Sequence, residues 1–217
     1  MSMRRCGAIL FLVLLGGFAA SSCAPSVPAA DCSAAPHRGV DFHGCDLSGR
    51  DFSGTDLSYA DLSLANLTGT DLRRSALTSS KMYLTNLLGA DLRGARSGLI
   101  EGTPLVLPAA SWSLRRGYFV GPGADLSGAD LSGLNLSGAD LSMSTLIAAN
   151  LSSANLARVN FAGSVLYLAN LSGADLSYAD FTQTELIRAD LTGANLTGTI
   201  WAFTRCLEDG TVQSTPC

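Results

Sequence analysis

The chain has 217 residues and a formal net charge of −4 at pH 7; 47% of its residues are hydrophobic and only 15% are charged. This mildly acidic balance provides no basic surface of the kind with which nucleic-acid-binding proteins contact phosphates, so we expect no nucleic-acid partner.

The chain begins with a pattern typical of export. Arg4 and Arg5 precede an apolar run at residues 8–20, which has the length of a secretory signal and is too short to span a bilayer as a stable helix. The run ends in small residues before Cys23, and this resembles the lipobox of bacterial lipoproteins. We therefore expect residues 1–22 to be a signal peptide and Cys23 to carry a lipid that anchors the protein to the cell membrane, facing outside the cytoplasm. Cleavage by an ordinary signal peptidase, which would give a secreted soluble protein, is the alternative.

Residues 23–39 are rich in Ala, Pro and Ser, and we interpret them as a lipid-anchored tether and the start of an N-terminal cap. Without Arg4 and Arg5 the formal charge falls from −4 to −6.

Four cysteines lie beyond the signal and lipobox: Cys32, Cys45, Cys206 and Cys217. An even number in an exported chain favours disulfides, for which four cysteines allow three connectivities. A metal site is the competing interpretation. Their spacings match no zinc motif, however, and His37 and His43 are the only histidines.

Apolar residues recur at every fifth position in two blocks, residues 40–97 and residues 124–203. A small residue, usually Ala, stands two places before each apolar residue, and Asp or Asn stands one place before it. A period of five matches neither an amphipathic helix nor a half-buried strand, so the pattern indicates a repeat architecture.

The repeat A-(D/N)-L-x-x, as in Ala60-Asp61-Leu62 and Ala189-Asp190-Leu191, resembles the pentapeptide repeat family. The resemblance implies an all-β fold, a right-handed quadrilateral β-helix in which four pentapeptides form one coil. Leu and the small residue would point inward and the other three residues outward. Packing agrees, because a Leu on every side leaves room for only a small second inward group.

The implied rod also pairs the cysteines. Cys32 and Cys45 would lie at one end, and Cys206 and Cys217 at the other, so the resemblance implies the disulfides Cys32–Cys45 and Cys206–Cys217. Residues 204–217 would then form a disulfide-closed C-terminal cap.

The two blocks are separated by a segment of different composition, residues 98–123. Leu92 and Leu126 are 34 residues apart, which is not a multiple of five. The segment contains the aromatic residues Trp112, Tyr118 and Phe119, and we predict an ordered loop or small hairpin that leaves the side of the rod.

One set of outward positions is apolar, in pentapeptides whose inward small residue is Ser or Thr. We predict that these residues form one interaction face: Tyr83, Leu84, Ile147, Tyr167, Leu168 and Ile187. We expect the inserted segment to leave the rod from the same face. Its aromatic residues would cover part of the face as a second core, and the uncovered remainder would be a binding patch.

No catalytic constellation is apparent. His37 and His43 lie in the N-terminal cap region, and the many Asp residues occupy repeat positions on flat faces without a cleft that would shift their pKa. We expect no enzyme activity, cofactor or metal. The leading hypothesis is a rigid, non-enzymatic envelope scaffold that binds an unknown protein or a second copy of itself.

Two alternatives remain. Some pentapeptide repeat proteins mimic DNA and inhibit topoisomerases, but here Asn interrupts the acidic ladders, as in Asp130-Asn150-Asn170-Asp190, and export separates the chain from gyrase. The further alternative is cell-wall glycan binding on the Ser and Thr ladders.

Overall fold

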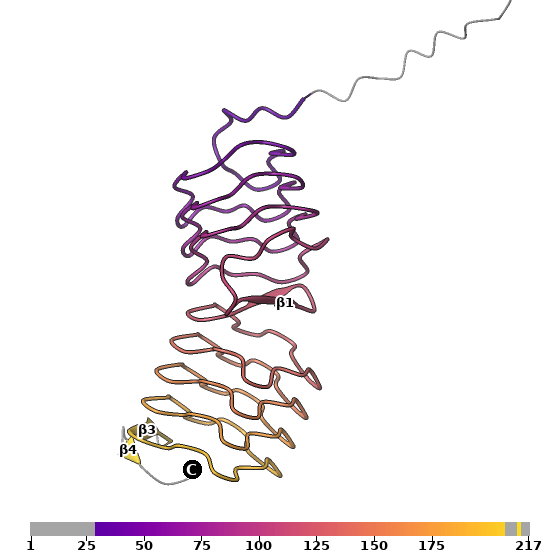
Figure 1. The fold of residues 1–217 in the computed structure, drawn as a ribbon. Coiled ribbons are helices and arrows are strands. Elements are labelled where there is room, and N and C mark those ends of the chain that lie inside the picture. Colours follow the sequence, from indigo (N-terminus) through magenta and orange to yellow (C-terminus); the bar gives the residue numbers. More distant parts are fainter. Residues whose placement is uncertain (1–28, 207–211, 214–217) are drawn as a thin grey trace, which may run out of the picture.

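The structure is a computed structural model, and residues 29–206 and 212–213 are described from it. These residues form a rod of stacked coils (Figure 1). Parallel backbone bridges join residues 20 apart, as in Asp41 with Asp61 and Asp61 with Lys81. One coil therefore holds four pentapeptides, and the predicted all-β solenoid is confirmed. Its right-handed sense stays a prediction, and residues 1–22, Cys23 and Cys217 lie outside the described residues.

The coil has four sides, which we number in chain order. The first side begins at Asp41, the second at Asp46, the third at Asp51 and the fourth at Asp56. In the second block the fourth side comes first: the fourth, first, second and third sides resume at Asp125, Asp130, Asn135 and Asp140.

Each corner is a tight turn that the pentapeptide encodes. The carbonyl of the central apolar residue accepts the N–H three residues on, as in Cys45 N to Phe42 O at 3.0 Å. The residue before that N–H has a positive φ, as does Gly44 at 68°, which is the pattern of a type II turn. The Asp before the central residue also stabilises the turn, because Asp46 Oδ1 accepts the N–H of Ser48 at 3.1 Å.

The central side chains form one continuous core that runs from Val40 to Trp201. Almost all of them are no more than 4% exposed, from Phe42 to Phe181. On the third side the rings stack, with centroids 5.3 Å apart for Phe161 and Phe181 and 4.8 Å apart for Phe181 and Trp201. The predicted inward positions are confirmed.

Inward Ser and Thr hydroxyls donate to backbone carbonyls, either within their own turn, as Ser75 Oγ does to Leu72 O at 2.7 Å, or in the preceding coil. Thr85 Oγ1 donates to Leu62 O at 2.7 Å, and Thr184 Oγ1 donates to Phe161 O at 2.8 Å. The exception in the described part of the chain is the buried hydroxyl of Ser80, which has no hydrogen-bond partner.

The inserted segment contains the predicted hairpin. Strand β1 (Ser113–Arg115) pairs antiparallel with β2 (Tyr118–Val120). The coil continues further than the predicted boundary at residue 98, however, because Val106 still bridges to Asn86 on the second side. Across the insert, Arg96 bridges to Asp125, 29 residues on. The hairpin therefore adds nine residues to one coil of 20 and returns the chain on the third side.

The hairpin tip lies between two coils where the described residues show no bridge from Glu101 to the next coil (Figure 1). Gly117 O accepts the N–H of Ile100 at 3.2 Å. The Arg116 guanidinium donates to Asp130 O at 3.4 Å and to Ser132 O at 3.2 Å. Arg116 thus supplies the N–H groups that the backbone of a regular neighbouring coil would supply.

The insert aromatics do not form the second core that we predicted. Trp112 and Phe119, 8% and 1% exposed, belong to the same core as the coils. Gly121 occupies a central inward position, since its carbonyl accepts the N–H of Ala124 as in a regular turn. A Cβ on Gly121 would lie 2.3 Å from the Trp112 ring, so the indole fills the place of the missing Leu.

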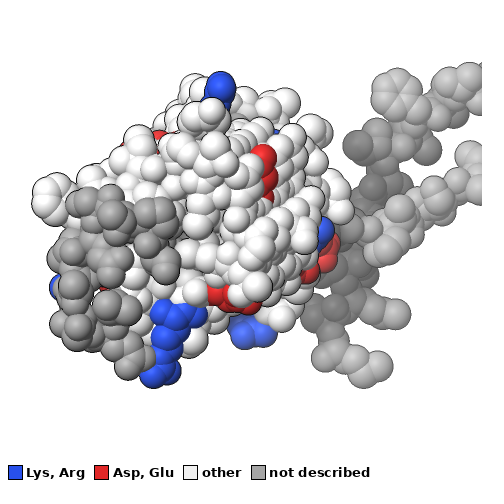
Figure 2. All heavy atoms as spheres, turned by 90° about the horizontal axis from the view of Figure 1, so that it is seen from below, with Lys and Arg blue, Asp and Glu red and all other residues white. Residues whose placement is uncertain are grey.

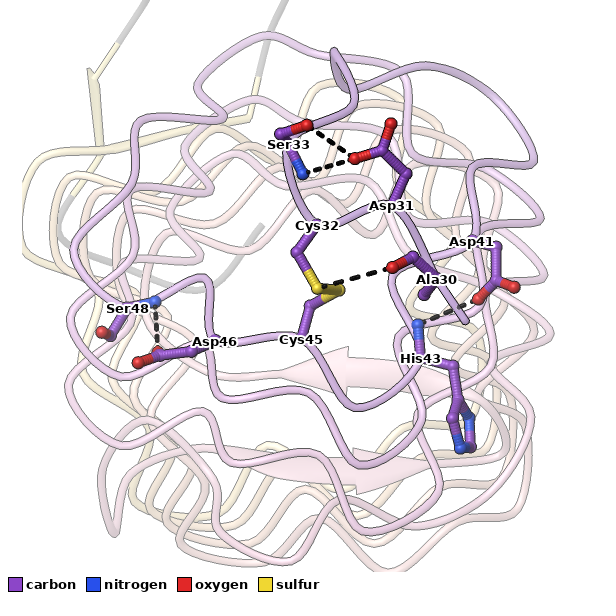
Figure 3. Close-up of a disulfide and its surroundings, with 9 residues drawn as sticks. All are labelled: Ala30, Asp31, Cys32, Ser33, Asp41, His43, Cys45, Asp46 and Ser48. Atoms are coloured by element: carbon purple, nitrogen blue, oxygen red, sulfur yellow. Dashed lines mark hydrogen bonds between the residues drawn. A yellow bond between two sulfur atoms is a disulfide. The ribbon is translucent and has the colours of Figure 1, made fainter. Parts of the chain in front are cut away.

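A disulfide closes the N-terminal end of the rod. The predicted Cys32–Cys45 bond is confirmed, and it holds the N-terminal segment over the first coil (Figure 3). At the other end, β3 (Thr204–Arg205) pairs antiparallel with β4 (Val212–Gln213). Cys206 is disulfide-bonded, while its predicted partner Cys217 lies outside the described residues.

Candidate interaction surfaces

The fourth side of the second block carries an apolar ladder. Bridges from Thr145 to Val165 and from Val165 to Glu185 place the next outward residues in register. We call these residues and their neighbour Leu168 the fourth-side ladder: Ile147, Tyr167, Leu168 and Ile187. Ile147 is 39% and Leu168 47% exposed, and the other two are half-buried. These four residues therefore lie on one side of the rod, and their role as an interaction face stays a prediction.

Tyr83 and Leu84 were assigned to the same face, and this prediction is wrong. They follow Lys81, which bridges to Asp61 and Glu101 on the first side. Across the insert, equivalent positions of successive coils are 29 residues apart and not 20. Pentapeptides of similar sequence in the two blocks therefore occupy different sides of the rod. The insert also leaves from the second side, after Val106, and not from the fourth-side ladder.

Tyr83 and Leu84 instead belong to a separate apolar corner between the first and second sides. Its exposed members also include Leu64 and Leu105, each more than half exposed. Leu64 occupies an outward position of a regular repeat, so its apolar character was the signal in the sequence that could have identified this corner.

The insert aromatics pack one coil above the ladder. The Phe119 N–H donates to Ser97 Oγ at 2.9 Å, and the ring of half-buried Tyr118 lies 3.1 Å from where Gly98 would carry a Cβ. The exposed fractions of Ile147 and Leu168 show that this packing leaves the ladder accessible.

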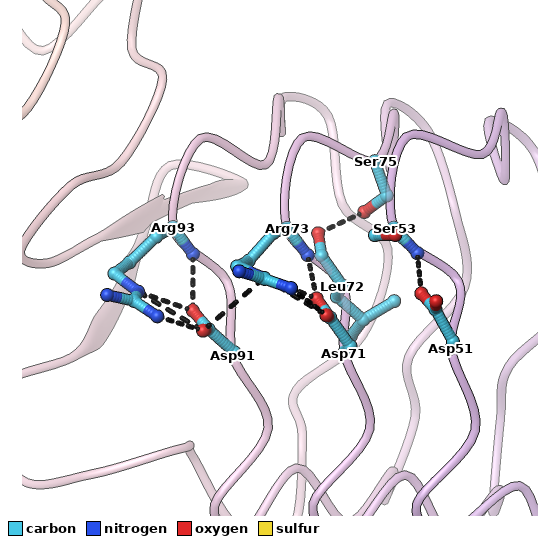
Figure 4. A network of polar contacts seen from close by, with 8 residues as sticks. All are labelled: Asp51, Ser53, Asp71, Leu72, Arg73, Ser75, Asp91 and Arg93. Carbon is cyan, nitrogen blue, oxygen red and sulfur yellow. Dashed lines mark hydrogen bonds and ion pairs between the residues drawn. The ribbon is translucent and has the colours of Figure 1, made fainter.

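On the third side of the first block, the carboxylates of Asp51, Asp71 and Asp91 stack from coil to coil. Each accepts a hydrogen bond from the residue two places on in its own turn (Figure 4). Arg73 Nε lies 3.0 Å from both oxygens of Asp71 and 3.8 Å from Asp91 Oδ2. Arg93 Nε donates in the same way to Asp91 at 2.9 Å. Hydrogen bonding from Arg73 lowers the pKa of Asp71 to about 2. The stacked acids are therefore ionised and offset by arginine at neutral pH.

In the second block Asn separates the acids. The amides of Asn150 and Asn160 donate to Asp130 and Asp140, both at 3.2 Å, from one coil to the next. Figure 2 views the rod from its C-terminal end and shows acidic atoms in small separate patches among uncharged ones. This spacing differs from the continuous acidic stripe that a DNA mimic requires.

The histidines and acids form no reactive group in the part of the chain that the structure describes. His43 Nδ1 lies 3.9 Å from Asp61 Oδ1 on the surface, and His37 Nδ1 lies 2.9 Å from the carbonyl of Arg38. Within residues 29–206 and 212–213, no cluster of three His, Cys, Asp or Glu residues could hold a metal ion. The same residues include no helix of the length and apolarity needed to cross a bilayer.

Comparison with known proteins identifies the repeats. A family model described as pentapeptide repeats matches eight copies, at residues 38–74, 60–96, 124–163, 144–177 and 164–200. Among solved structures, a pentapeptide repeat protein from the Arabidopsis thaliana thylakoid lumen is 43% identical over 35% of this chain and 52% of its own, with a TM-score of 0.34. The chain thus spans about half the length of that protein. No match was found among curated proteins.

Two further structures match over more of the chain. HetL, a pentapeptide repeat protein involved in heterocyst differentiation regulation from the cyanobacterium Nostoc, is 28% identical over 81% of this chain and 92% of its own, with a TM-score of 0.26. Trypsin-treated QnrB1, a plasmid-mediated fluoroquinolone resistance protein, is 23% identical over 76% of this chain and 83% of its own, with a TM-score of 0.32.

Proposed function

We propose that this chain, which belongs to the pentapeptide repeat family, is a non-enzymatic scaffold that binds another protein through its fourth-side ladder. The observation that carries the proposal is the in-register row of Ile147, Tyr167 and Ile187 with the exposed Leu168 beside it. Contiguous exposed apolar side chains on a folded protein commonly mark a partner surface.

The solenoid makes this surface rigid. Each ladder residue follows an inward Leu that is 3% exposed or less, as Leu146, Leu166 and Leu186 show. The backbone that carries the ladder is therefore fixed by the core, and binding would order little chain. A preorganised apolar surface loses less conformational entropy on association than a flexible one.

The proposal includes export and anchoring. The apolar run after Arg4 and Arg5 and the small residues before Cys23 support a signal peptide and a lipid at Cys23. A right-handed quadrilateral rod tethered by residues 23–39 would present its sides outside the cytoplasm, next to the membrane.

The test compares two matched double variants. Tyr167→Ser with Ile187→Ser removes two ladder residues, while Tyr83→Ser with Leu84→Ser removes two apolar residues of the other corner. Crosslinking from position 168 in whole cells should capture a partner, or a second copy, with the wild type and the second variant but not with the first. Equal capture by both variants, with unchanged thermal unfolding, would exclude the ladder.

The topoisomerase hypothesis is tested separately. Supercoiling by gyrase should proceed unchanged in the presence of the purified chain, because Asn separates the acids in the second block and arginines pair with Asp71 and Asp91 in the first. Clear inhibition would reverse the ranking of the two functions.

A further inference from the structure

A groove follows the corner between the third and fourth sides, above the fourth-side ladder. Three arginines line it, Arg73, Arg74 and Arg93, and Met143 and Thr145 line its other end. The groove encloses a volume of about 860 Å³ and is open to solvent. We call it the arginine groove.

Glycines form the floor of the groove. Gly94 and Gly123 occupy the turn position that carries Arg74 one coil above and Met143 one coil below. A Cβ on Gly94 would lie 3.2 Å from Arg74 Cγ, and one on Gly123 would lie 3.0 Å from Arg93 Cγ. The aliphatic parts of both arginines thus lie across glycines, along the groove.

The groove contains N–H donors that its own acids do not use. Arg73 and Arg93 bond to Asp71 and Asp91 through Nε and Nη2, which leaves Nη1 of each without an acceptor among the described residues. The Arg74 side chain makes no hydrogen bond or ion pair in the same part of the chain, although the Arg74 backbone N–H donates to Arg93 O at 3.1 Å. Since the other two arginines are offset by carboxylates, Arg74 is the cation whose charge is available to a ligand.

We propose that the arginine groove binds a phosphate group. Arg73 and Arg93 stand on successive coils, about 4.8 Å apart, and Arg74 adds a third guanidinium beside them. A planar carboxylate has two oxygens and pairs well with one guanidinium, whereas a phosphate presents oxygens in several directions and can accept from several. The chemistry is that of a phosphate ester, either free in solution or in a phospholipid headgroup.

The first experiment titrates the full chain with glycerol phosphate at constant ionic strength and follows the backbone amide resonances of Gly94 and Gly123. Both should shift and saturate. Arg74→Ala should weaken binding about tenfold, the loss expected for a hydrogen bond between charged groups. Arg158→Ala is the matched control, because Arg158 lies over the Tyr178 ring at 5.8 Å on another corner. It should bind like the wild type.

Vesicles distinguish the two sources. Stronger binding to phosphatidylglycerol than to phosphatidylcholine vesicles, lost in Arg74→Ala, identifies a lipid headgroup; titration by glycerol phosphate without this preference identifies a soluble phosphate ester. Arg74→Gln keeps a long polar side chain and removes the charge, so it controls for the loss of packing in Arg74→Ala. It should bind as weakly as Arg74→Ala. The proposal is overturned if the glycine amides do not shift, or if Arg74→Ala binds glycerol phosphate as tightly as the wild type while remaining folded.

Discussion

The Asp or Asn before each central Leu has a local task that spacing alone does not reveal. Its side-chain oxygen accepts the N–H two residues on, as Asp51 does from Ser53 at 2.8 Å and Asn170 does from Ser172 at 2.9 Å. Asp and Asn make such bonds readily because the side chain is short. The inward and outward positions followed from the sequence, since a closed tube must bury the apolar residue. The function of the polar residue required the backbone conformation.

The buried hydroxyls allow a test at single residues. Ser80→Ala should raise the free energy of unfolding by about 1 kcal/mol, because it removes a buried hydroxyl that has no partner. Thr85→Ser keeps the bond to Leu62 O, whereas Thr85→Val removes it and should lower stability by about 1 kcal/mol. Urea denaturation of the three variants measures these changes. Destabilisation by Ser80→Ala would show that its hydroxyl is bonded in solution.

Two glycines are expected to respond to alanine for different reasons. Gly121→Ala should cost about 3 kcal/mol, since the new Cβ would overlap the Trp112 ring. Gly128→Ala meets no atom within 4 Å but has a φ of 68°, so strain alone should cost about 1 kcal/mol. Thermal unfolding should rank the variants in this order. The reverse order would mean that Trp112 does not fill the inward place at Gly121.

Among the elements, the hairpin was the hardest to place from sequence. Its existence could be predicted from the composition of residues 98–123, because its strand-forming and aromatic residues interrupt the repeat. Its register could not, since only the bridge from Arg96 to Asp125 shows how the chain resumes. The misplacement of Tyr83 and Leu84 follows from this, as the offset between the two blocks depends on how many residues the hairpin adds to the coil.

Arg116 provides the test of how the hairpin connects the blocks. Arg116→Met should lower the free energy of unfolding by about 1 to 2 kcal/mol, because the carbonyls of Asp130 and Ser132 lose charged donors. Hydrogen exchange should also rise at residues 131–134. The neighbouring Arg115→Met is the control, since the one hydrogen bond of the Arg115 side chain among the described residues goes to the carbonyl of Leu114. Equal effects of the two changes would contradict the role of Arg116.

At the scale of the whole molecule, the rod and its single core were predictable because a five-residue period permits few ways to bury so many Leu side chains. Which outward side chains lie next to one another on the surface was harder to predict from the sequence. The apolar corner at Leu64 and Leu84 and the arginine groove at Arg74 each combine residues from successive coils, and their proximity depends on the turn conformation at every corner.

The acids predict how stability depends on pH. Hydrogen bonds from Ser side chains and backbone N–H groups lower the pKa of Asp46 and Asp51, and Arg73 lowers that of Asp71 to about 2. Their stabilisation is therefore complete above the ordinary Asp pKa of about 4 and is lost as the pH falls through the lower folded values. The melting temperature should fall between about pH 4 and pH 2.

Scanning calorimetry at several pH values measures this fall, and Asp71→Asn should reduce its slope at the acid end. A melting temperature independent of pH over that range would show that the carboxylate bonds do not stabilise the folded state.

The 20-residue coil has a consequence for how such a protein can change in length. A gene that duplicates or loses one pentapeptide rotates everything downstream by a quarter turn and separates ladders that had been aligned. The gain or loss of whole coils avoids this redistribution of the outer surface. The nine residues of the hairpin show another route, because a segment that leaves the coil and returns to the next side alters length without turning the remainder of the rod.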